Sequence, residues 1–305
     1  MSRGATRFAP APTGPLHLGH LANALYVWGL AGTTRRAVIL RIEDHDRQRS
    51  RPEHETALLD DLDRLGLVPD RPSTAELRAG PSDYRQGDCG PRYAGALARL
   101  LDAGLAYACD CARSTFAAWR STHGRSWSGA GCPGGCRGRA LPLDSGLGIR
   151  VALGDGPEAW RDVLAGPQQG PVASDGDVLA LDRLGNWTYA FCVVVDDLEQ
   201  GIDLVVRGQD LLEATPVQIR LGRLLGRKEP PTFAHHALIR NRDGSKLSKA
   251  THATAVGSLL DSGRSAADLF GEAASLVGLI DRPRALRPEA FPGVVRERVG
   301  LPPSR

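Results

Sequence analysis

Two short segments at opposite ends of the chain constrain its fold more than any other feature. Residues 10–20 read PAPTGPLHLGH, a stiff proline- and glycine-rich turn between a strand-like run at 6–9 and apolar residues at helical spacing. Residues 244–249 read GSKLSK and hold two of the three lysines in the chain. Because the other basic residues are mostly arginines, these lysines indicate a compact, mobile ammonium suited to phosphate.

The sequence around the first segment predicts a parallel α/β sheet. A helix is expected to begin near His17, a buried strand to span 37–42, and a second helix to span 52–65 with Gly66 at its end. Strand, helix, strand and helix in this order are typical of parallel α/β folds. The pattern returns later in the chain, with an apolar run at 189–195, a strand at 202–206 and a helix at 210–225.

The middle third of the chain interrupts this pattern. A helix is expected over 93–103, glycine is dense from 124 to 148, and short strands are expected at 149–153 and 178–181. We therefore predict an insertion in the α/β domain, followed by two helical stretches after Lys249 and a tail broken up by prolines. The expected divisions are 1–75 and 185–243 for the two halves of the α/β domain, 76–184 for the α+β insertion, and 244–305 for the lysine segment and a small C-terminal helical domain.

The composition is that of a globular protein, with 42% hydrophobic residues, 24% charged residues and a net charge of +3. This mildly basic balance does not by itself indicate nucleic-acid binding. No run approaches the roughly 18 apolar residues of a membrane helix, and residues 1–10 lack the apolar core of a secretory signal. We therefore expect a cytoplasmic protein with no membrane partner.

The first segment has the features of a phosphate site. A helix N-terminus offers unpaired N–H groups and a partial positive charge, and Gly14 and Gly19 allow close approach of a ligand to the backbone. His17 and His20 are three residues apart, so that one helical turn brings them together. The alternative is a capped helix start with two surface histidines.

The second segment complements the first. Lys246, Ser248 and Lys249 supply two cations and a hydroxyl that can hold a triphosphate while pyrophosphate leaves. Alone, they can equally form a solvated basic loop. Since the two segments flank an α/β pattern in the correct order, we predict one ATP site with His17, His20, Lys246 and Lys249 as the catalytic groups. The expected ATP-binding set is Thr13, Gly14, His17, Gly19, His20, Lys246, Ser248 and Lys249.

Four stretches resemble the glutamyl branch of the class I aminoacyl-tRNA synthetases, namely residues 7–14 (RFAPAPTG), 41–44 (RIED), 207–212 (RGQDLL) and 246–249 (KLSK). The resemblance extends from about residue 7 to about 278. It implies a Rossmann-type parallel sheet on which L-glutamate is activated with ATP and Mg(II).

The resemblance also implies a glutamate pocket. Arg7 and Arg207 can each bind either carboxylate of the substrate through a forked contact, and Glu43 can pair with its ammonium. Two positions depart from the family, because Ala11 replaces the usual serine and Ala250 follows the lysine motif. The implied pocket residues are Arg7, Phe8, Ala9, Pro10, Ala11, Glu43, Tyr189 and Arg207.

Only 56 residues follow Lys249, so we expect no anticodon-binding domain. In this the chain resembles the short members of the family, the glutamyl-queuosine tRNA(Asp) synthetases. That resemblance implies a monomer that activates glutamate without tRNA and transfers it to queuosine at the wobble position of tRNA(Asp). The alternatives are a truncated glutamyl-tRNA synthetase that charges the 3′ end of tRNA(Glu), a non-catalytic tRNA-binding paralogue, and another adenylyl-transferring enzyme.

Four of the six cysteines form two close pairs, Cys109-x-Cys111 and Cys132-x3-Cys136. Four thiolates suit tetrahedral Zn(II). The short-paralogue resemblance also implies zinc here, although Cys132 stands where that family has a tyrosine. We predict one structural zinc site, the alternative being reduced cysteines that are close by chance. The remaining Cys89 and Cys192 are interpreted as structural thiols.

Five arginines surround this cysteine segment. They either contact RNA phosphates or form a solvated face, and the sequence supports both equally. They are Arg113, Arg120, Arg125, Arg137 and Arg139.

Overall fold

The computed structural model describes residues 4–112, 114–115, 132, 135–143, 146–172, 176–239 and 254–301. Several predicted residues lie outside these ranges: Lys246, Ser248 and Lys249 of the lysine segment, and Arg113, Arg120 and Arg125 of the cysteine segment. None of the helices within the ranges is long and apolar enough to cross a membrane.

The first half of the parallel sheet is formed as the sequence predicts. Strand β1 (Ala5–Phe8) runs parallel to β2 (Ala37–Leu40), and helix α1 (Leu18–Thr34) connects them. All four side chains of β1 are buried, as expected for a central strand covered on both faces. The loop after β2 leads to α2 (Pro52–Leu65), which ends at Gly66 in a left-handed conformation.

The second half joins the first across β1. Helix α6 (Tyr189–Glu199) precedes β8 (Leu204–Gly208), and the Asp203 N–H donates to the Ala5 carbonyl over 3.0 Å. Strand β8 pairs in parallel with β9 (Thr232–His236), and helix α7 (Thr215–Leu224) connects these two strands. The parallel strands therefore lie side by side in the order β2, β1, β8, β9.

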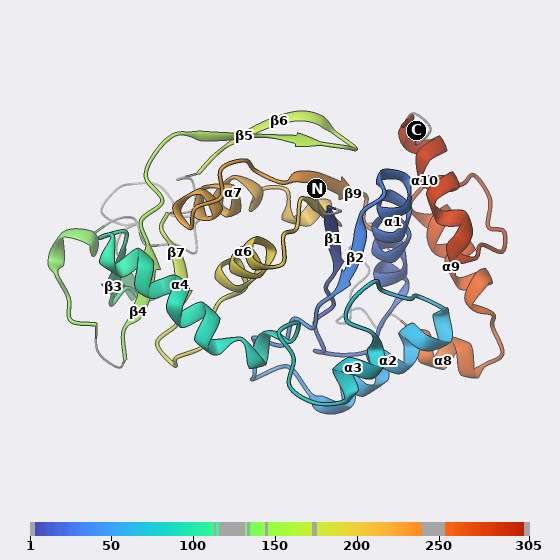
Figure 1. Cartoon of the computed structure of the whole chain (residues 1–305), viewed down its shortest axis with the longest axis horizontal. Helices are drawn as coiled ribbons and strands as arrows, with labels where there is room; N and C mark the ends of the chain where they lie inside the picture. Colours follow the sequence, from blue (N-terminus) through green and yellow to red (C-terminus); the bar gives the residue numbers. More distant parts are fainter. Residues whose placement is uncertain are drawn as a thin grey trace.

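The segment between the halves contributes to two sheets. Helix α4 (Gly90–Asp102) leads into an antiparallel sheet in the order β3 (Ala106–Cys109), β4 (Gly148–Val151) and β7 (Val178–Leu181). This sheet lies at the end of the molecule opposite to the C-terminal helices (Figure 1). The other two strands of the segment, β5 (Pro157–Asp162) and β6 (Gly166–Pro171), extend the parallel sheet beyond β9.

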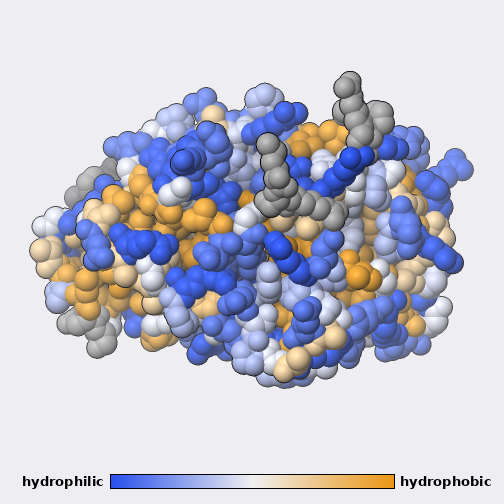
Figure 2. All heavy atoms as spheres, viewed as in Figure 1, coloured by the Kyte–Doolittle hydropathy of each residue, from blue (hydrophilic) through white to orange (hydrophobic). Residues whose placement is uncertain are grey.

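The C-terminal helices pack on α1. Phe270 and Phe291 are fully buried in the same apolar cluster as Phe8 and Leu25, so the tail shares the core of the α/β domain. Polar and apolar side chains alternate in patches over the face seen in Figure 2, as is usual for a globular protein. The helices of this region are α8 (Val256–Asp261), α9 (Ala266–Leu276) and α10 (Phe291–Val299).

Two short elements lie earlier in the chain, between α2 and α4. They are α3 (Thr74–Arg78) and η1 (Gln86–Asp88).

The structure corrects the sequence expectations at three places. The tail is helical at α10, because Pro292 occupies the first turn, where its missing N–H is not needed. The helix expected from 210 is a 3₁₀ turn, η4 (Gln209–Leu211), followed by α7. Strands β5, β6 and β9 were not anticipated. The class of fold is as predicted, and the boundaries of the domains stay a prediction.

We predict that Gly271→Ala destabilises the protein. A Cβ atom at Gly271, on α9, would lie 1.9 Å from the carbonyl oxygen of Arg284. The backbone at Arg284 would therefore have to move away from α9. The free energy of unfolding should fall by about 1–3 kcal/mol, measured by urea denaturation. The matched control is Gly95→Ala in α4, where a Cβ meets nothing within 4 Å; it should be neutral or stabilise by up to about 1 kcal/mol. Equal midpoints for the two variants would contradict the prediction.

Candidate active site

A cleft of about 690 Å³ opens at the carboxyl ends of the parallel strands. The chain continues from β1 to β2 on one side, and the second half of the sheet is added on the other side of β1. The strand order therefore reverses at β1, and open α/β sheets bind ligands at such a reversal. All eight residues of the predicted glutamate pocket line the cleft, together with His17, Gly19 and His20. Thr13 and Gly14 are not among the lining residues; they lie in the loop between β1 and α1 that leads to them.

The two histidines form the start of α1. His17 is the N-cap residue; its Nδ1 accepts from the Gly19 N–H, and its own N–H donates to Nδ1 of His20 over 3.0 Å. Since both Nδ1 atoms are acceptors, each neutral ring carries its proton on Nε2. Both rings can therefore donate from Nε2 to an anionic oxygen. A Cβ at Gly19 would lie 2.8 Å from His17 Cε1, which explains the glycine.

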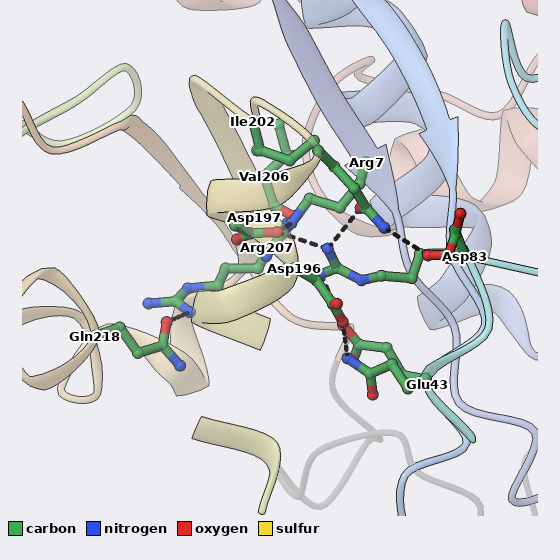
Figure 3. Close-up of polar contacts among 12 residues, drawn as sticks. Arg7, Glu43, Asp83, Asp196, Asp197, Ile202, Val206, Arg207 and Gln218 are labelled. Atoms are coloured by element: carbon green, nitrogen blue, oxygen red, sulfur yellow. Dashed lines mark hydrogen bonds and ion pairs between the residues drawn. The ribbon is translucent and has the colours of Figure 1, made fainter. Parts of the chain in front are cut away.

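Arg7 and Glu43 are held by a buried ion-pair network. Asp197 of α6 accepts from Arg7 Nε at 3.0 Å and from Arg41 at 2.7 Å, and Arg41 also donates to Glu43 over 3.0 Å (Figure 3). Burial by itself raises the pKa of Asp197. The charges and hydrogen bonds of Arg7 and Arg41 lower the pKa by more than burial raises it, so that it lies below its ordinary value. This carboxylate stays charged and fixes two residues of the predicted pocket.

Arg207, at the end of β8, is held by neutral groups. It donates to Gln218 at 2.5 Å (Figure 3). It also donates to Thr215 at 2.7 Å and to His235 Nε2 at 3.0 Å. Burial lowers the pKa of this guanidinium, and in the described part of the chain no carboxylate pairs with it. A buried cation whose hydrogen-bond partners are neutral is suited to bind a carboxylate.

Asp162 of β5 supports Arg207 through His235. Its Oδ2 lies 2.6 Å from His235 Nδ1, and its Oδ1 accepts from the N–H groups of Leu164 and Ala165. Burial raises the pKa of Asp162, but these hydrogen bonds bring it below its ordinary value. The charged carboxylate keeps the proton of neutral His235 on Nδ1, so Nε2 can accept from Arg207.

Tyr189, at the start of α6, completes the predicted pocket. Its phenol is within the electrostatic field of Glu43 and Arg207, and burial raises its pKa above the ordinary value. The hydroxyl therefore stays protonated and can donate a hydrogen bond to a ligand.

The family model for the catalytic domain of class I tRNA synthetases (E and Q) matches residues 5–130 and 154–265. The chain belongs to this family of synthetases. It is 40% identical to the glutamyl-Q tRNA(Asp) synthetase of Symbiobacterium thermophilum over 291 residues, which cover 93% of this chain and 89% of the relative. With the glutamate–tRNA ligase of Frankia alni the identity is 36%, but only 53% of that ligase is covered.

A solved structure supports the same fold. The glutamate tRNA ligase of Elizabethkingia meningosepticum, in complex with its amino acid, matches with a TM-score of 0.77 at 25% identity. The match covers 95% of this synthetase and 64% of that chain. The resemblance to the glutamyl branch, and to its short members, is thus confirmed, and the protein is an enzyme of the ligase type.

The cleft of this synthetase also contains residues that the sequence did not single out. Asn23 Nδ2 lies 3.0 Å from His236 Nε2, whose ring stacks on Tyr26. The charged Asp197 beneath the cleft was missed as well, although an acidic pair at the end of an apolar helix (VVVDD, 193–197) is a recognisable pattern for a buried ion pair. The unanticipated lining residues with polar side chains are Asn23, His45, Arg49, Asp210 and His236.

The four clustered cysteines come together. Their sulfur atoms all lie within 4.8 Å of one another, and Cys111 Sγ is 3.6 Å from Cys132 Sγ and 3.5 Å from Cys136 Sγ. Tetrahedral zinc thiolates have sulfurs about 3.8 Å apart, given Zn–S bonds of about 2.3 Å. The donor set therefore fits a structural Zn(II).

Two of the arginines near this cluster form local ion pairs. Arg137 pairs with Asp177, and Arg139 pairs with Asp110 at 2.7 Å. Asp177 also accepts from the Tyr107 hydroxyl at 2.5 Å. These contacts tie the cysteine loops to β3 and to the residue before β7, a structural role that the sequence did not distinguish from RNA contact.

We predict that Cys111→Ser abolishes metal binding. A serine hydroxyl is a poor ligand for zinc, so the purified variant should hold far less than the one zinc per chain expected of the unmodified protein, by elemental analysis. Cys89→Ser is the matched control, because Cys89 is buried away from the cluster and donates to backbone carbonyls. Full zinc in Cys111→Ser would refute the four-cysteine site.

We also predict that Asp162→Asn weakens glutamate binding. Both carboxylate oxygens accept hydrogen bonds, so an amide must turn an N–H toward either His235 or the Leu164 and Ala165 N–H groups. With Arg207 misplaced, KM for glutamate in pyrophosphate exchange should rise about tenfold, equivalent to about 1.4 kcal/mol. Asp155→Asn, an exposed carboxylate just before β5, serves as the control. An unchanged KM would show that the Asp162–His235 contact does not position Arg207.

Proposed function

We propose that this synthetase activates L-glutamate with Mg-ATP and transfers it to the queuosine base of tRNA(Asp). The observation that carries the choice of amino acid is Arg207, a buried guanidinium whose partners in the described chain are neutral. It binds one substrate carboxylate, while Arg7, already shared with Asp197, lies near the other. Glu43 pairs with the substrate ammonium.

In the first step, the α-carboxylate of glutamate attacks the α-phosphorus of ATP in line. The bond from phosphorus to the leaving pyrophosphate breaks as glutamyl-adenylate forms. His17 and His20 donate from Nε2 to the phosphoryl oxygens, whose negative charge increases in the transition state. Mg(II) accompanies the triphosphate as part of the substrate.

Lys246, Ser248 and Lys249 bind the triphosphate in this proposal. Both flanks of the lysine segment support it. Ile239, the last described residue before the segment, lines the cleft, and after the segment the Val256 N–H donates to the carbonyl of Leu16, directly before His17. The chain on one side of the lysine segment therefore lies at the cleft, and the chain on the other side lies next to His17.

In the second step, a hydroxyl of the queuosine cyclopentenediol attacks the glutamyl carbonyl, and AMP leaves. The choice of acceptor rests on the relatives, because those named glutamyl-Q tRNA(Asp) synthetase are matched over 89% and 97% of their own length. Zinc has a structural role in this proposal, with Cys109, Cys111, Cys132 and Cys136 as its ligands.

We further propose that the protein acts as a cytoplasmic monomer, with the two-part catalytic domain, insertion and C-terminal helical domain predicted from the sequence.

The acceptor is tested by charging with radiolabelled glutamate. We expect glutamate-dependent pyrophosphate exchange without any tRNA, followed by glutamylation of tRNA(Asp) that carries queuosine. Queuosine-free tRNA(Asp) should accept less than one hundredth as much, since it lacks the attacked hydroxyl.

The controls separate the alternatives. Charging of tRNA(Glu) at its 3′ end would overturn the proposed acceptor and favour a truncated glutamyl-tRNA synthetase. Absence of exchange with every amino acid would indicate a non-catalytic paralogue.

A further inference from the structure

His45 lines the cleft but takes no part in the activation step described above. It lies in the loop after β2, two residues beyond Glu43. Its ring centroid is 6.1 Å from that of Tyr189, a residue of the glutamate pocket. The substrate ammonium that pairs with Glu43 is one carbon away from the carbonyl that the acceptor attacks. His45 therefore belongs to the wall of the cleft next to the reacting carbon.

The backbone around His45 is firmly held. The Gly87 N–H of η1 donates to Asp44 Oδ1 over 2.6 Å, and the backbones of Ile42 and Gln86 are joined by a 3.0 Å hydrogen bond. A Cβ at Gly87 would lie 2.5 Å from Asp44 Oδ2, so the approach of the two segments requires this glycine. The ring of His45 is thus presented from a rigid loop.

A chain of buried hydrogen bonds sets the tautomer of His45. Asp196 is fully buried and pairs with Arg92 at 2.9 Å, and its Oδ2 lies 2.9 Å from Gln86 Nε2. Because a carboxylate only accepts, the Gln86 amide must turn its NH₂ toward Asp196 and its oxygen toward His45. Gln86 Oε1 is 2.7 Å from His45 Nδ1, which must therefore carry the proton.

The other nitrogen of neutral His45 is consequently an acceptor. Within the described ranges, the structure gives Nε2 of this ring no protein partner, in contrast to Nδ1. This arrangement, a proton fixed on Nδ1 by an outer group and a lone pair on Nε2 at a substrate cleft, is that of a general base.

We propose that His45 is the general base of the transfer step. This inference rests on the proposed function. As the acceptor hydroxyl attacks, its oxygen forms a bond to the glutamyl carbonyl carbon and its proton passes to His45 Nε2. The carbonyl bond to AMP then breaks and AMP leaves with the electron pair. The proton on His45, now an imidazolium held by Gln86, is released to solvent.

The test separates the two steps of the reaction. Transfer from preformed glutamyl-adenylate to queuosine-containing tRNA(Asp) is measured in a single turnover, and adenylate formation is measured by pyrophosphate exchange. In His45→Ala and in the near-isosteric His45→Gln, transfer should slow by about 10²–10⁴-fold. Exchange should stay within about twofold, because the activation step needs no base. Added imidazole should restore transfer at least tenfold in His45→Ala and not in His45→Gln.

His54→Ala is the matched control, since this histidine lies on α2 and outside the cleft; it should leave both steps unchanged. Unaltered transfer in both His45 variants would overturn the proposal, as would an equal loss of exchange and transfer without rescue by imidazole. If the unmodified enzyme exchanges pyrophosphate but does not charge queuosine-containing tRNA(Asp), the proposed acceptor fails instead. The same variants then test His45 with tRNA(Glu).

Discussion

The carboxylate of Asp197 is the interaction on which the catalytic domain depends. It comes from α6, after the long middle segment, and binds Arg7 of β1 and Arg41, the residue directly after β2. Both halves of the parallel sheet are thereby joined by charge as well as by strand pairing. Burying three such groups is costly, and only close contacts with several partners make it tolerable. Removing Asp197 alone would take the carboxylate partner from Arg7 and leave the buried Arg41 with Glu43 as its ion-pair partner.

This network gives the two pocket arginines different properties. Arg7 is neutralised in part by Asp197, and the same network holds Glu43 through Arg41. Arg207 is surrounded by an amide, a hydroxyl and an imidazole, which orient its charge without cancelling it. Preorganisation of this kind means that little side-chain freedom is lost when an acidic substrate binds.

The sequence predicts the regular parts of this molecule well where local chemistry decides. Helix α2 has its expected bounds because Pro52 fits a first helical turn and Gly66 ends the helix. Strand β5 pairs over six residues with the adjacent β6, but β6 reads GPQQGP and has no apolar alternation by which a hairpin could be recognised. The contact of β5 with β9, some 70 residues away, is a single backbone pairing of Asp162 with Phe233. The proline-rich tail misled because Pro292 stands in the one turn where proline favours a helix.

The candidate site divides in the same way. His17, Glu43 and Arg207 were identified from motifs, and the structure brings them to one cleft. The groups that orient Glu43 and Arg207 were not, because Asp197 acts through Arg41 and Asp162 acts through His235, and these contacts form only in the tertiary structure. Family resemblance identifies the residues that line the cleft more readily than the residues that hold them in place.

Strand β5 has a consequence for how such proteins diversify. It belongs to the stretch between the two halves of the parallel sheet, yet its Asp162 reaches the arginine of the amino-acid pocket through one histidine. The stretch is therefore not structurally independent of the two halves of the parallel sheet. A recombination event that exchanged this stretch between relatives would also replace Asp162, which holds Arg207 through His235, so the stretch and the cleft must evolve together.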